Sequence, residues 1–417
     1  MKRYDELLFN RFYEDWHHKS VDELLSLLKV KTQTTLPATL SKADLTGKLN
    51  IKLGIDPTGA DIHIGHLCPI FCLNILLKFG HHIDFIIGDF TAKIGDPSGR
   101  NTERAMITDE QIAKNFASYT KQIAPYIDIN KISVRKNSEW LSKYSLSDFL
   151  AILQRIKLSV ATQREDFRNR IENVSLAEVC YAVLMGLDSV NLQTNIELGG
   201  IDQILNFSQC RLVQEIYGKK QELALCVPIL EGLSGDGRKM SKSYNNYIAV
   251  SASAEDKFGK FMSLPDNLLL KYYQAFGYLY AEEIPDLVDF ITKYPLEAKK
   301  QLATYFVSLD GNNLDIGRSE REKFERKFSK KELTADDFVT VRVAPNTDIV
   351  SAIFAANKFS SKGEIKRLVL ANAVTNLDTN EKIGVDFKVT KNTKIKVGKL
   401  NIFSLEVSKW TMNELLN

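Results

Sequence analysis

The sequence predicts an α/β protein in which a doubly wound parallel sheet is followed by a helical domain and a small C-terminal α+β domain. From residue 49 to 230, short β-rich runs alternate with amphipathic stretches, as expected for parallel strands connected by helices. Residues 252–335 show helical spacing throughout, and the charged run at 318–333 fits a solvated helix face. From Val339, short helices are expected to precede a β-rich stretch at 388–407. We therefore expect three domains, bounded at 1–250, 251–338 and 339–417.

Four β-rich runs are expected to form the sheet, with helices between them. The strands are NIKLGID (50–56), HIDFIIGD (82–89), ISVRK (132–136) and LALCVPIL (223–230). The helices are expected at 67–79, 110–126, 145–157 and 202–217, where apolar residues recur at helical spacing.

Bulk properties exclude several classes of protein. A chain of 417 residues exceeds the usual size of one domain, and 44% hydrophobic with 26% charged residues is typical of a globular protein rather than a disordered one. The longest apolar stretch, at 67–77, is too short to span a bilayer. The N-terminus mixes acidic with basic residues, which argues against a targeting peptide. We expect a cytoplasmic protein.

The five cysteines predict neither a disulfide framework nor a zinc site, because their number is odd and no CxxC spacing repeats. Cys68 and Cys72 lie one helical turn apart in an apolar run. They are expected in the core.

The first motif with chemical potential is GIDPTGADIHIGHL (54–67), which follows a predicted strand and opens a helix. His63 and His66 would share one face near the helix N-terminus, where free backbone NH groups can hold phosphate. A surface pair or a metal-binding pair is the alternative, although no third ligand stands nearby at metal spacing. Alone, the segment does not decide between these interpretations.

The second motif is EGLSGDGRKMSKSYNN (231–246), in which three glycines precede Lys239 and Lys242. Glycines followed by two lysines suit a mobile loop that closes on an anionic ligand. A surface hairpin with basic tips explains this segment equally well when it is taken in isolation.

Together the two motifs match a known pair letter for letter. His63-Ile64-Gly65-His66 and Lys239-Met240-Ser241-Lys242-Ser243 resemble the HIGH and KMSKS signatures of class I aminoacyl-tRNA synthetases. The surrounding segments are similar to bacterial-type tyrosyl-tRNA synthetases, strongly over residues 45–270 and more weakly elsewhere. Those segments are IGDFTAKIGDPSGR (87–100), NSEWL (137–141), DSV (188–190), ELGGIDQ (197–203) and PILEGL (228–233).

The resemblance implies a Rossmann-like catalytic domain, a helical anticodon-side domain and a tyrosine-tRNA ligase reaction. The tyrosine carboxylate would attack the α-phosphate of ATP, and a tRNA ribose hydroxyl would then accept the aminoacyl group. Catalysis would consist of positioning and charge stabilisation, without an enzyme nucleophile. ATP with Mg²⁺ is expected as substrate, with no tightly bound cofactor and no protein metal site. The expected partners are L-tyrosine, ATP, tRNA(Tyr) and a second copy of the chain in a homodimer.

The resemblance also implies roles for individual residues. Contacts to the ATP phosphates, and hence catalysis, are implied for Thr58, His63, His66, Lys239 and Lys242. ATP binding is implied for Gly65, Gly200, Asp202 and again Lys242. Tyrosine binding is implied for Asp96 and Tyr181 at the ammonium group, Gln203 at the carboxylate side and Asp188 at the phenol hydroxyl.

Asp188 would be the specificity residue. Phenylalanine would leave such a buried acceptor unpaired, and discrimination of about 10⁵-fold is a property of tyrosyl-tRNA synthetases in general rather than a result of this sequence. Without the family pattern, an N-terminal helix cap or a surface acid is the less favoured alternative for Asp188.

Four positions depart from the pattern of the family. Met185 replaces a glutamine that helps to hold the substrate ammonium, Leu187 replaces a tyrosine, and Ile201 replaces a small hydroxyl residue. Lys52 stands where many members carry a second phenol-binding tyrosine, although one bacterial branch also reads KLG here. These departures leave open a paralogue that activates a tyrosine-like amino acid.

The C-terminal region resembles the small RNA-binding module that ends these synthetases. Between Lys358 and Lys409, basic residues outnumber acidic ones by 11 to 5. RNA contacts are implied for Lys362, Lys366 and Arg367, while Ala371-Asn372-Ala373 replaces the usual glycine-containing turn. A catalytically inactive RNA-binding protein is a further alternative, which the intact HIGH and KMSKS residues disfavour.

Overall fold

The computed structural model describes residues 2–57, 62–96, 107–162, 167, 171–329, 337–398 and 401–408. The chain divides into two compact units, Met1–Arg321 and Glu322–Asn417. The boundary expected at 250 falls inside the first unit, so the division between a catalytic and a helical domain remains a proposal. Within the described ranges, no helix is both long and apolar enough to cross a membrane.

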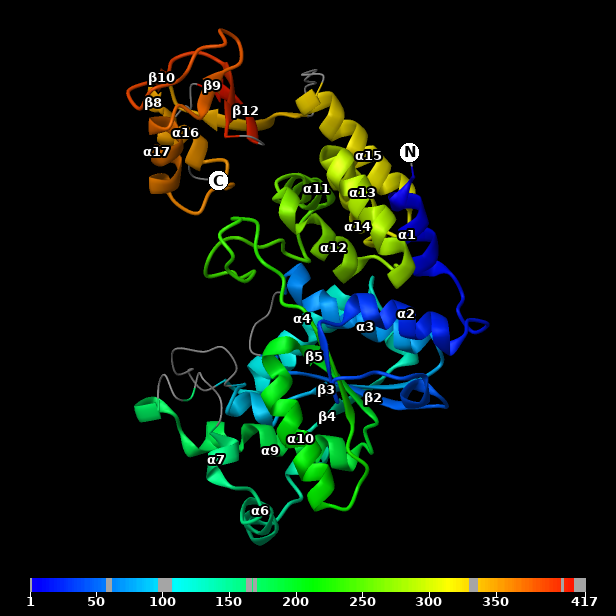
Figure 1. Cartoon of the computed structure of the whole chain (residues 1–417). Coiled ribbons are helices and arrows are strands. Elements are labelled where there is room, and N and C mark those ends of the chain that lie inside the picture. The colour runs from blue at the N-terminus through cyan, green and yellow to red at the C-terminus, as the bar shows by residue number, and fades with distance from the viewer. Residues whose placement is uncertain are drawn as a thin grey trace. The chain divides into compact units, whose positions relative to one another are not determined.

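A six-stranded sheet forms the centre of the first unit (Figure 1), in the order β1-β6-β5-β2-β3-β4. Its strands are β1 (Thr34–Leu36), β2 (Asn50–Ile55), β3 (His82–Ile87), β4 (Ser133–Lys136), β5 (Ile196–Gly200) and β6 (Leu223–Val227). All neighbouring pairs among β2 to β6 are parallel, whereas β1 pairs antiparallel with β6. The chain order reverses between β2 and β5, which makes the sheet doubly wound and places a ligand crevice at the carboxyl ends of these two strands.

All four predicted strands are present, and two others were missed. β5 carries Gly199 and Gly200, which are depleted in strands, and its buried Ile196 and Leu198 pair with partners distant in sequence. β1 has three residues and is defined only by its pairing with β6. Neither strand offers a periodic pattern of its own.

Helices cover both faces of the sheet. In Figure 1, α2 (Val21–Lys31) and α3 (Leu67–Lys78) lie above the sheet, and α9 (Leu176–Asn191) and α10 (Ile204–Ile216) lie below it. α4 (Asp109–Ile123), α5 (Ser138–Leu141), α6 (Leu146–Leu153) and α7 (Leu158–Ala161) complete this part. Cys68 and Cys72 are buried in α3, as predicted for core residues.

The remainder of the first unit is helical, as predicted. It contains α11 (Ala254–Met262), α12 (Leu269–Phe276), α13 (Ile284–Lys293), α14 (Pro295–Leu309) and most of α15 (Leu314–Phe324), whose last residues belong to the second unit. The N-terminal helix α1 (Tyr4–Tyr13) packs here as well: the backbone NH of Tyr4 donates to Gln301 Oε1 at 2.7 Å, and Arg11 pairs with Glu283. The first residues of the chain therefore stabilise the helical part.

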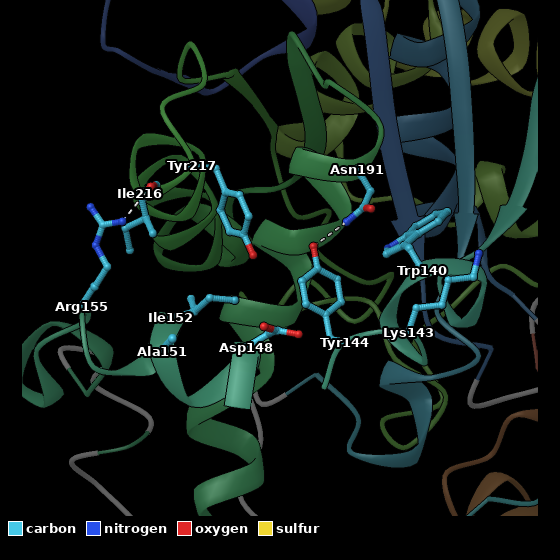
Figure 2. A pocket seen from close by; sticks show the side chains of 10 residues that line it. All are labelled: Trp140, Lys143, Tyr144, Asp148, Ala151, Ile152, Arg155, Asn191, Ile216 and Tyr217. Carbon is cyan, nitrogen blue, oxygen red and sulfur yellow. Dashed lines mark hydrogen bonds between the residues drawn. The ribbon is translucent and has the colours of Figure 1, made fainter. Parts of the chain in front are cut away.

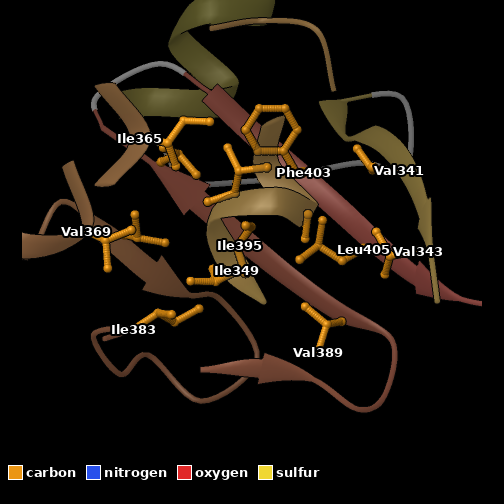
Figure 3. Close-up of a cluster of buried hydrophobic side chains, with 14 residues drawn as sticks. Val341, Val343, Ile349, Ile365, Val369, Ile383, Val389, Ile395, Phe403 and Leu405 are labelled. Atoms are coloured by element: carbon orange, nitrogen blue, oxygen red, sulfur yellow. The ribbon is translucent and has the colours of Figure 1, made fainter. Parts of the chain in front are cut away.

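The second unit has a sheet of order β7-β12-β11-β9 around its own core. Its elements are β7 (Val339–Val343), β8 (Thr347–Asp348), α16 (Ile349–Phe354), α17 (Lys362–Leu370), β9 (Val374–Asn376), β10 (Lys388–Val389), β11 (Thr393–Val397) and β12 (Asn401–Val407). Figure 3 shows the core, in which Ile349 and Ile365 of the helices meet Ile395 and Phe403 of the strands. The expectation that helices come first was wrong, because β7 precedes them and pairs in parallel with β12.

Candidate active site

A cleft of about 660 Å³ lies at the carboxyl ends of β2 and β5. All the described residues with a predicted catalytic, ATP-binding or tyrosine-binding role line it: His63, Gly65, His66, Asp96, Tyr181, Asp188, Gly200, Asp202, Gln203, Lys239 and Lys242. Thr58 lies outside the described residues. The topology explains this convergence, since the HIGH segment follows β2 and the GGIDQ segment follows β5, the two strands at which the sheet reverses.

The HIGH segment is held by the chain that follows the KMSKS motif. His63 forms an antiparallel bridge with Ala249, and the backbone NH of Ile64 donates to the carbonyl of Ile248 at 3.0 Å. The His63 and His66 ring centroids are 3.9 Å apart. A Cβ atom at Gly65 would lie 2.9 Å from His63 Nδ1, so this close packing requires glycine. The space beside Gly65 is occupied by an imidazole in this structure.

The pKa values of both histidines are lowered, which favours their neutral forms. Burial, together with the nearby His66, Lys242 and Lys239, lowers the pKa of His63 to about 3. Burial likewise lowers the pKa of His66. Among the described residues, His63 Nδ1 is buried without a hydrogen-bond partner. A ligand in the cleft would therefore meet hydrogen-bonding imidazoles, while the positive charge comes from the lysines.

The KMSKS loop is closed at its base and bears its lysines at the surface. The backbones of Glu231 and Lys239 form an antiparallel β-bridge. The Asn246 side chain accepts from the backbone NH of Ser241 at 2.9 Å and donates to the carbonyl of Lys239 at 3.2 Å. At the tip of the loop, Gly235 and Gly237 have φ of 68° and 77°, which favour glycine. Lys239 and Lys242 are exposed.

One wall of the cleft carries a polar network built around Asp96. Asp96 accepts from Gln203 Nε2 at 2.6 Å and from Asn206 Nδ2 at 3.4 Å, and Asn206 also donates to Gln203 Oε1 at 2.7 Å. Asn206 is fully buried and was missed by the sequence analysis. Its only sequence signal was its place three residues after Gln203 on the same helical face.

Asp56 is the most important site residue that the sequence analysis did not assign. It follows β2 directly and accepts hydrogen bonds from the Thr91 hydroxyl at 2.8 Å and the Tyr181 hydroxyl at 2.9 Å. Burial, together with the nearby Asp96, raises its pKa to about 6, against the opposing hydrogen bonds from Thr91 and Tyr181. A Cβ atom at Gly88 would lie 2.1 Å from Asp56 Oδ1, so glycine makes room for this carboxylate. Its position at a strand end was the available signal.

Asp188 lies inside α9 and is buried, so neither a helix cap nor a surface acid describes it. It accepts from Trp140 Nε1 at 2.8 Å and from Asn137 Nδ2 at 3.4 Å. Burial raises its pKa to about 7, against the opposing effects of Lys52 and these two donors. Each carboxylate oxygen has a second lone pair, so Asp188 retains capacity to accept from a ligand.

Of the four departures from the family pattern, Met185 and Lys52 line the cleft. Met185 and Ile201 both pack against the small core of Phe207, Ala224 and Cys226. Leu187 is fully buried in a separate core and does not line the cleft.

A second cavity of about 600 Å³ lies between α6 and the C-terminal ends of α9 and α10 (Figure 2). Several of its polar groups are engaged within the protein: Arg155 donates to the carbonyl of Ile216 at 2.8 Å, and Asn191 donates to the Tyr144 hydroxyl at 3.0 Å. None of the predicted site residues lines this cavity.

The predicted RNA contacts lie in the second unit, on α17. Lys362, Lys366 and Arg367 are exposed, and Lys362 donates to the Ser351 hydroxyl at 3.0 Å. Asn372, after the end of the helix, has φ of 55°. Asparagine tolerates this conformation, so it can replace the glycine that such a turn usually contains.

Sequence comparisons place the chain among known proteins. Residues 44–320 match the family described as tRNA synthetases class I (W and Y). The chain is 33% identical to tyrosine–tRNA ligase 2 of Clostridium acetobutylicum, over 93% of this chain and all of that protein. It is 37% identical to tyrosine–tRNA ligase 2 of Photorhabdus laumondii, over 84% of this chain and 90% of that one.

Solved structures agree at the level of the fold. A C-terminally truncated mitochondrial tyrosyl-tRNA synthetase of Aspergillus nidulans aligns with a TM-score of 0.60 at 20% identity, over 78% of this chain and 99% of that one. The tyrosyl-tRNA synthetase of Archaeoglobus fulgidus, solved with L-tyrosine, aligns with a TM-score of 0.57 at 24% identity, over 72% of this chain and 100% of that one.

Proposed function

The chain belongs to the bacterial-type tyrosyl-tRNA synthetases, within the W and Y group of class I, and on this premise we propose that it acts as a tyrosine–tRNA ligase through the cleft at β2 and β5. The main support is the convergence, in that one cleft, of both ATP motifs with a buried carboxylate at position 188. Tyrosine, ATP and tRNA are the substrates of this family.

In the ATP half of the cleft, the proposed chemistry is charge neutralisation. His63 and His66 would donate neutral hydrogen bonds to the phosphates, and Lys239 and Lys242 would neutralise the leaving pyrophosphate. Gly200 and Asp202, at the end of β5, would receive the ribose. Mg²⁺ would accompany the ATP phosphates and screen their charge.

In the tyrosine half of the cleft, we propose that carboxylates bind the substrate ammonium in place of the glutamine that Met185 replaces. Asp96 and Tyr181 are the proposed ammonium ligands, and we add Asp56, because it accepts from the Tyr181 hydroxyl. The Met185 thioether is only a weak hydrogen-bond acceptor, so these acids would supply the attraction for the ammonium group. Gln203 would face the substrate carboxylate and Asp188 the phenol hydroxyl.

Pyrophosphate exchange into ATP tests the proposal when tyrosine is run beside phenylalanine, tryptophan and ring-substituted tyrosines. We expect exchange with tyrosine to exceed that with every other amino acid by a wide margin. Faster exchange with an analogue would favour the paralogue that activates a tyrosine-like amino acid. A lack of exchange with any amino acid would favour the inactive RNA-binding protein.

The second unit is proposed to bind tRNA through Lys362, Lys366 and Arg367, whose exposed charges share α17. The cytoplasm remains the proposed location, as expected for an enzyme that supplies protein synthesis.

We also propose a homodimer, because large apolar side chains are exposed in the first unit. Leu146 of α6, Leu158 of α7 and Leu176 of α9 are 74%, 67% and 81% exposed. Side chains of this kind are typical of an interface when they gather on one face, and we place these three on one face of the protomer.

The variant Leu176→Asp is expected to dissociate the dimer into monomers at micromolar concentration, measured by sedimentation equilibrium. Leu176 opens α9, where an acidic residue favours the helix, so the fold should be retained. Leu296→Asp is the matched control, since Leu296 is 58% exposed near the start of α14 and should leave the dimer intact. A Leu176→Asp variant that remains dimeric would contradict the proposed interface.

A further inference from the structure

Three buried ionisable side chains adjoin Asp188 without a role in the reaction described above. Lys52 of β2 is 2% exposed, and Glu197 of β5 and Glu222, just before β6, are 1% exposed. Ligand atoms of Glu197, Glu222 and Cys210 lie within 4.8 Å of one another, a spacing that suits a cation. The Lys52 ammonium, 2.7 Å from Glu197 Oε1, already supplies that positive charge. The cluster is therefore an internal ion pair.

All three donors of the Lys52 ammonium are used inside the protein. Besides Glu197, the ammonium donates to the Ser189 hydroxyl at 2.7 Å and to the backbone carbonyl of Met185 at 3.0 Å. An ammonium has three N–H bonds, so none remains for a substrate. Lys52 lines the cleft but cannot donate to the phenol without breaking one of these contacts.

The two helical contacts of Lys52 flank Asp188. Met185 and Ser189 lie one turn apart on α9, and the Ser189 hydroxyl also donates to the Met185 carbonyl at 3.3 Å. Lys52 thereby joins this turn to β2, and through Glu197 to β5.

The charges around Asp188 come from several elements. Lys52 and Glu197 face Asp188 from the sheet, and Tyr181 lies on the same helix as Asp188. The neutral donors Trp140 and Asn137 follow β4. Lys52 lowers the pKa of Asp188 and Glu197 raises it.

Glu222 lies beyond Glu197. Burial and the neighbouring Glu197 carboxylate raise the pKa of Glu222 well above its usual range. Lys52 is the positive charge that lies beside both Glu197 and Asp188.

We propose, on the basis of the tyrosine-binding role proposed above for Asp188, that Lys52 is a positioning residue for the phenol site. It fixes the α9 turn that carries Asp188, and it supplies the positive charge that lets this carboxylate accept the phenol hydroxyl in its ionised form. Lys52 acts entirely through Asp188 and does not touch the substrate.

The test measures the KM for tyrosine in pyrophosphate exchange from about pH 6 to 9. In Lys52→Met the pH at which tyrosine binding tightens should move upward by about one unit, because Asp188 loses its nearby positive charge. The KM for tyrosine at neutral pH should rise about tenfold, with little change in kcat or in the KM for ATP. Glu197→Gln should move the same profile downward, because it removes a negative charge.

Glu222→Gln is the matched control, since Glu222 belongs to the same buried cluster but does not line the cleft, and the variant should reproduce the parent's pH profile. An increase in KM that is the same at every pH in Lys52→Met, or shifts of equal sign in Lys52→Met and Glu197→Gln, would overturn the proposal. If Lys52→Met does not fold, Glu197→Gln decides alone: a downward shift supports the proposal and an unchanged profile overturns it. A parent protein without tyrosine-dependent exchange would refute the proposed function itself.

Discussion

Replacing Asp188 with alanine is expected to lower the discrimination between tyrosine and phenylalanine by about a thousandfold. A hydrogen bond to a charged group contributes about 1.5–3 kcal/mol, and an unpaired buried acceptor penalises phenylalanine by about 1–3 kcal/mol. The variant loses both effects, and their sum of about 4 kcal/mol corresponds to about a thousandfold. The ratio of kcat/KM for the two amino acids in pyrophosphate exchange measures the change directly.

Asp84→Ala separates this effect from a general loss of buried charge. Asp84 of β3 is also a buried carboxylate, 3.3 Å from His82 Nε2, and does not line the cleft. We expect it to leave the tyrosine preference unchanged. If Asp188→Ala kept the parent's preference, Asp188 would not be the phenol acceptor.

Lys242→Ala is expected to slow tyrosyl-adenylate formation by about a hundredfold, as loss of one preorganised contact to developing charge typically does. The KM for tyrosine should hardly change, because Lys242 lies on the loop side of the cleft, away from Asp188. His63→Asn should lower the same rate sharply. Single-turnover measurement of adenylate formation separates this step from transfer to tRNA.

Arg238→Ala is the matched control for Lys242→Ala. Arg238 is another cation of the same loop, but it pairs with Asp236, stacks on Tyr244 at 4.8 Å and does not line the cleft. Its removal should leave the adenylation rate close to that of the parent. Equal losses in both variants would show that the loop's total charge matters, rather than a contact made by Lys242.

The sequence predicted those parts of the fold whose signals are local. β2 and β3 are apolar runs, α3 is apolar almost throughout, and each could be placed without knowledge of its neighbours. β5 and β7 were missed because their identity as strands depends on partners far away in the chain.

The candidate site divides in the same way. His63 and Lys242 lie in motifs that are contiguous in sequence, so they could be identified in advance. Asp56, Asn206 and the Lys52 cluster could not, because their importance arises from contacts between strand ends and helices that only the folded chain brings together.

The backbone pairing between the two signature segments has a mechanical consequence. Ile64 donates to Ile248, Val250 donates to Ile62, and both contacts join main-chain atoms only. A link of this kind does not depend on side-chain identity, so point substitutions that abolish the chemistry of either motif leave the connection in place. The chain that follows the lysine-bearing loop is therefore tied to the histidine segment through the main chain, so a displacement of one segment would be transmitted to the other.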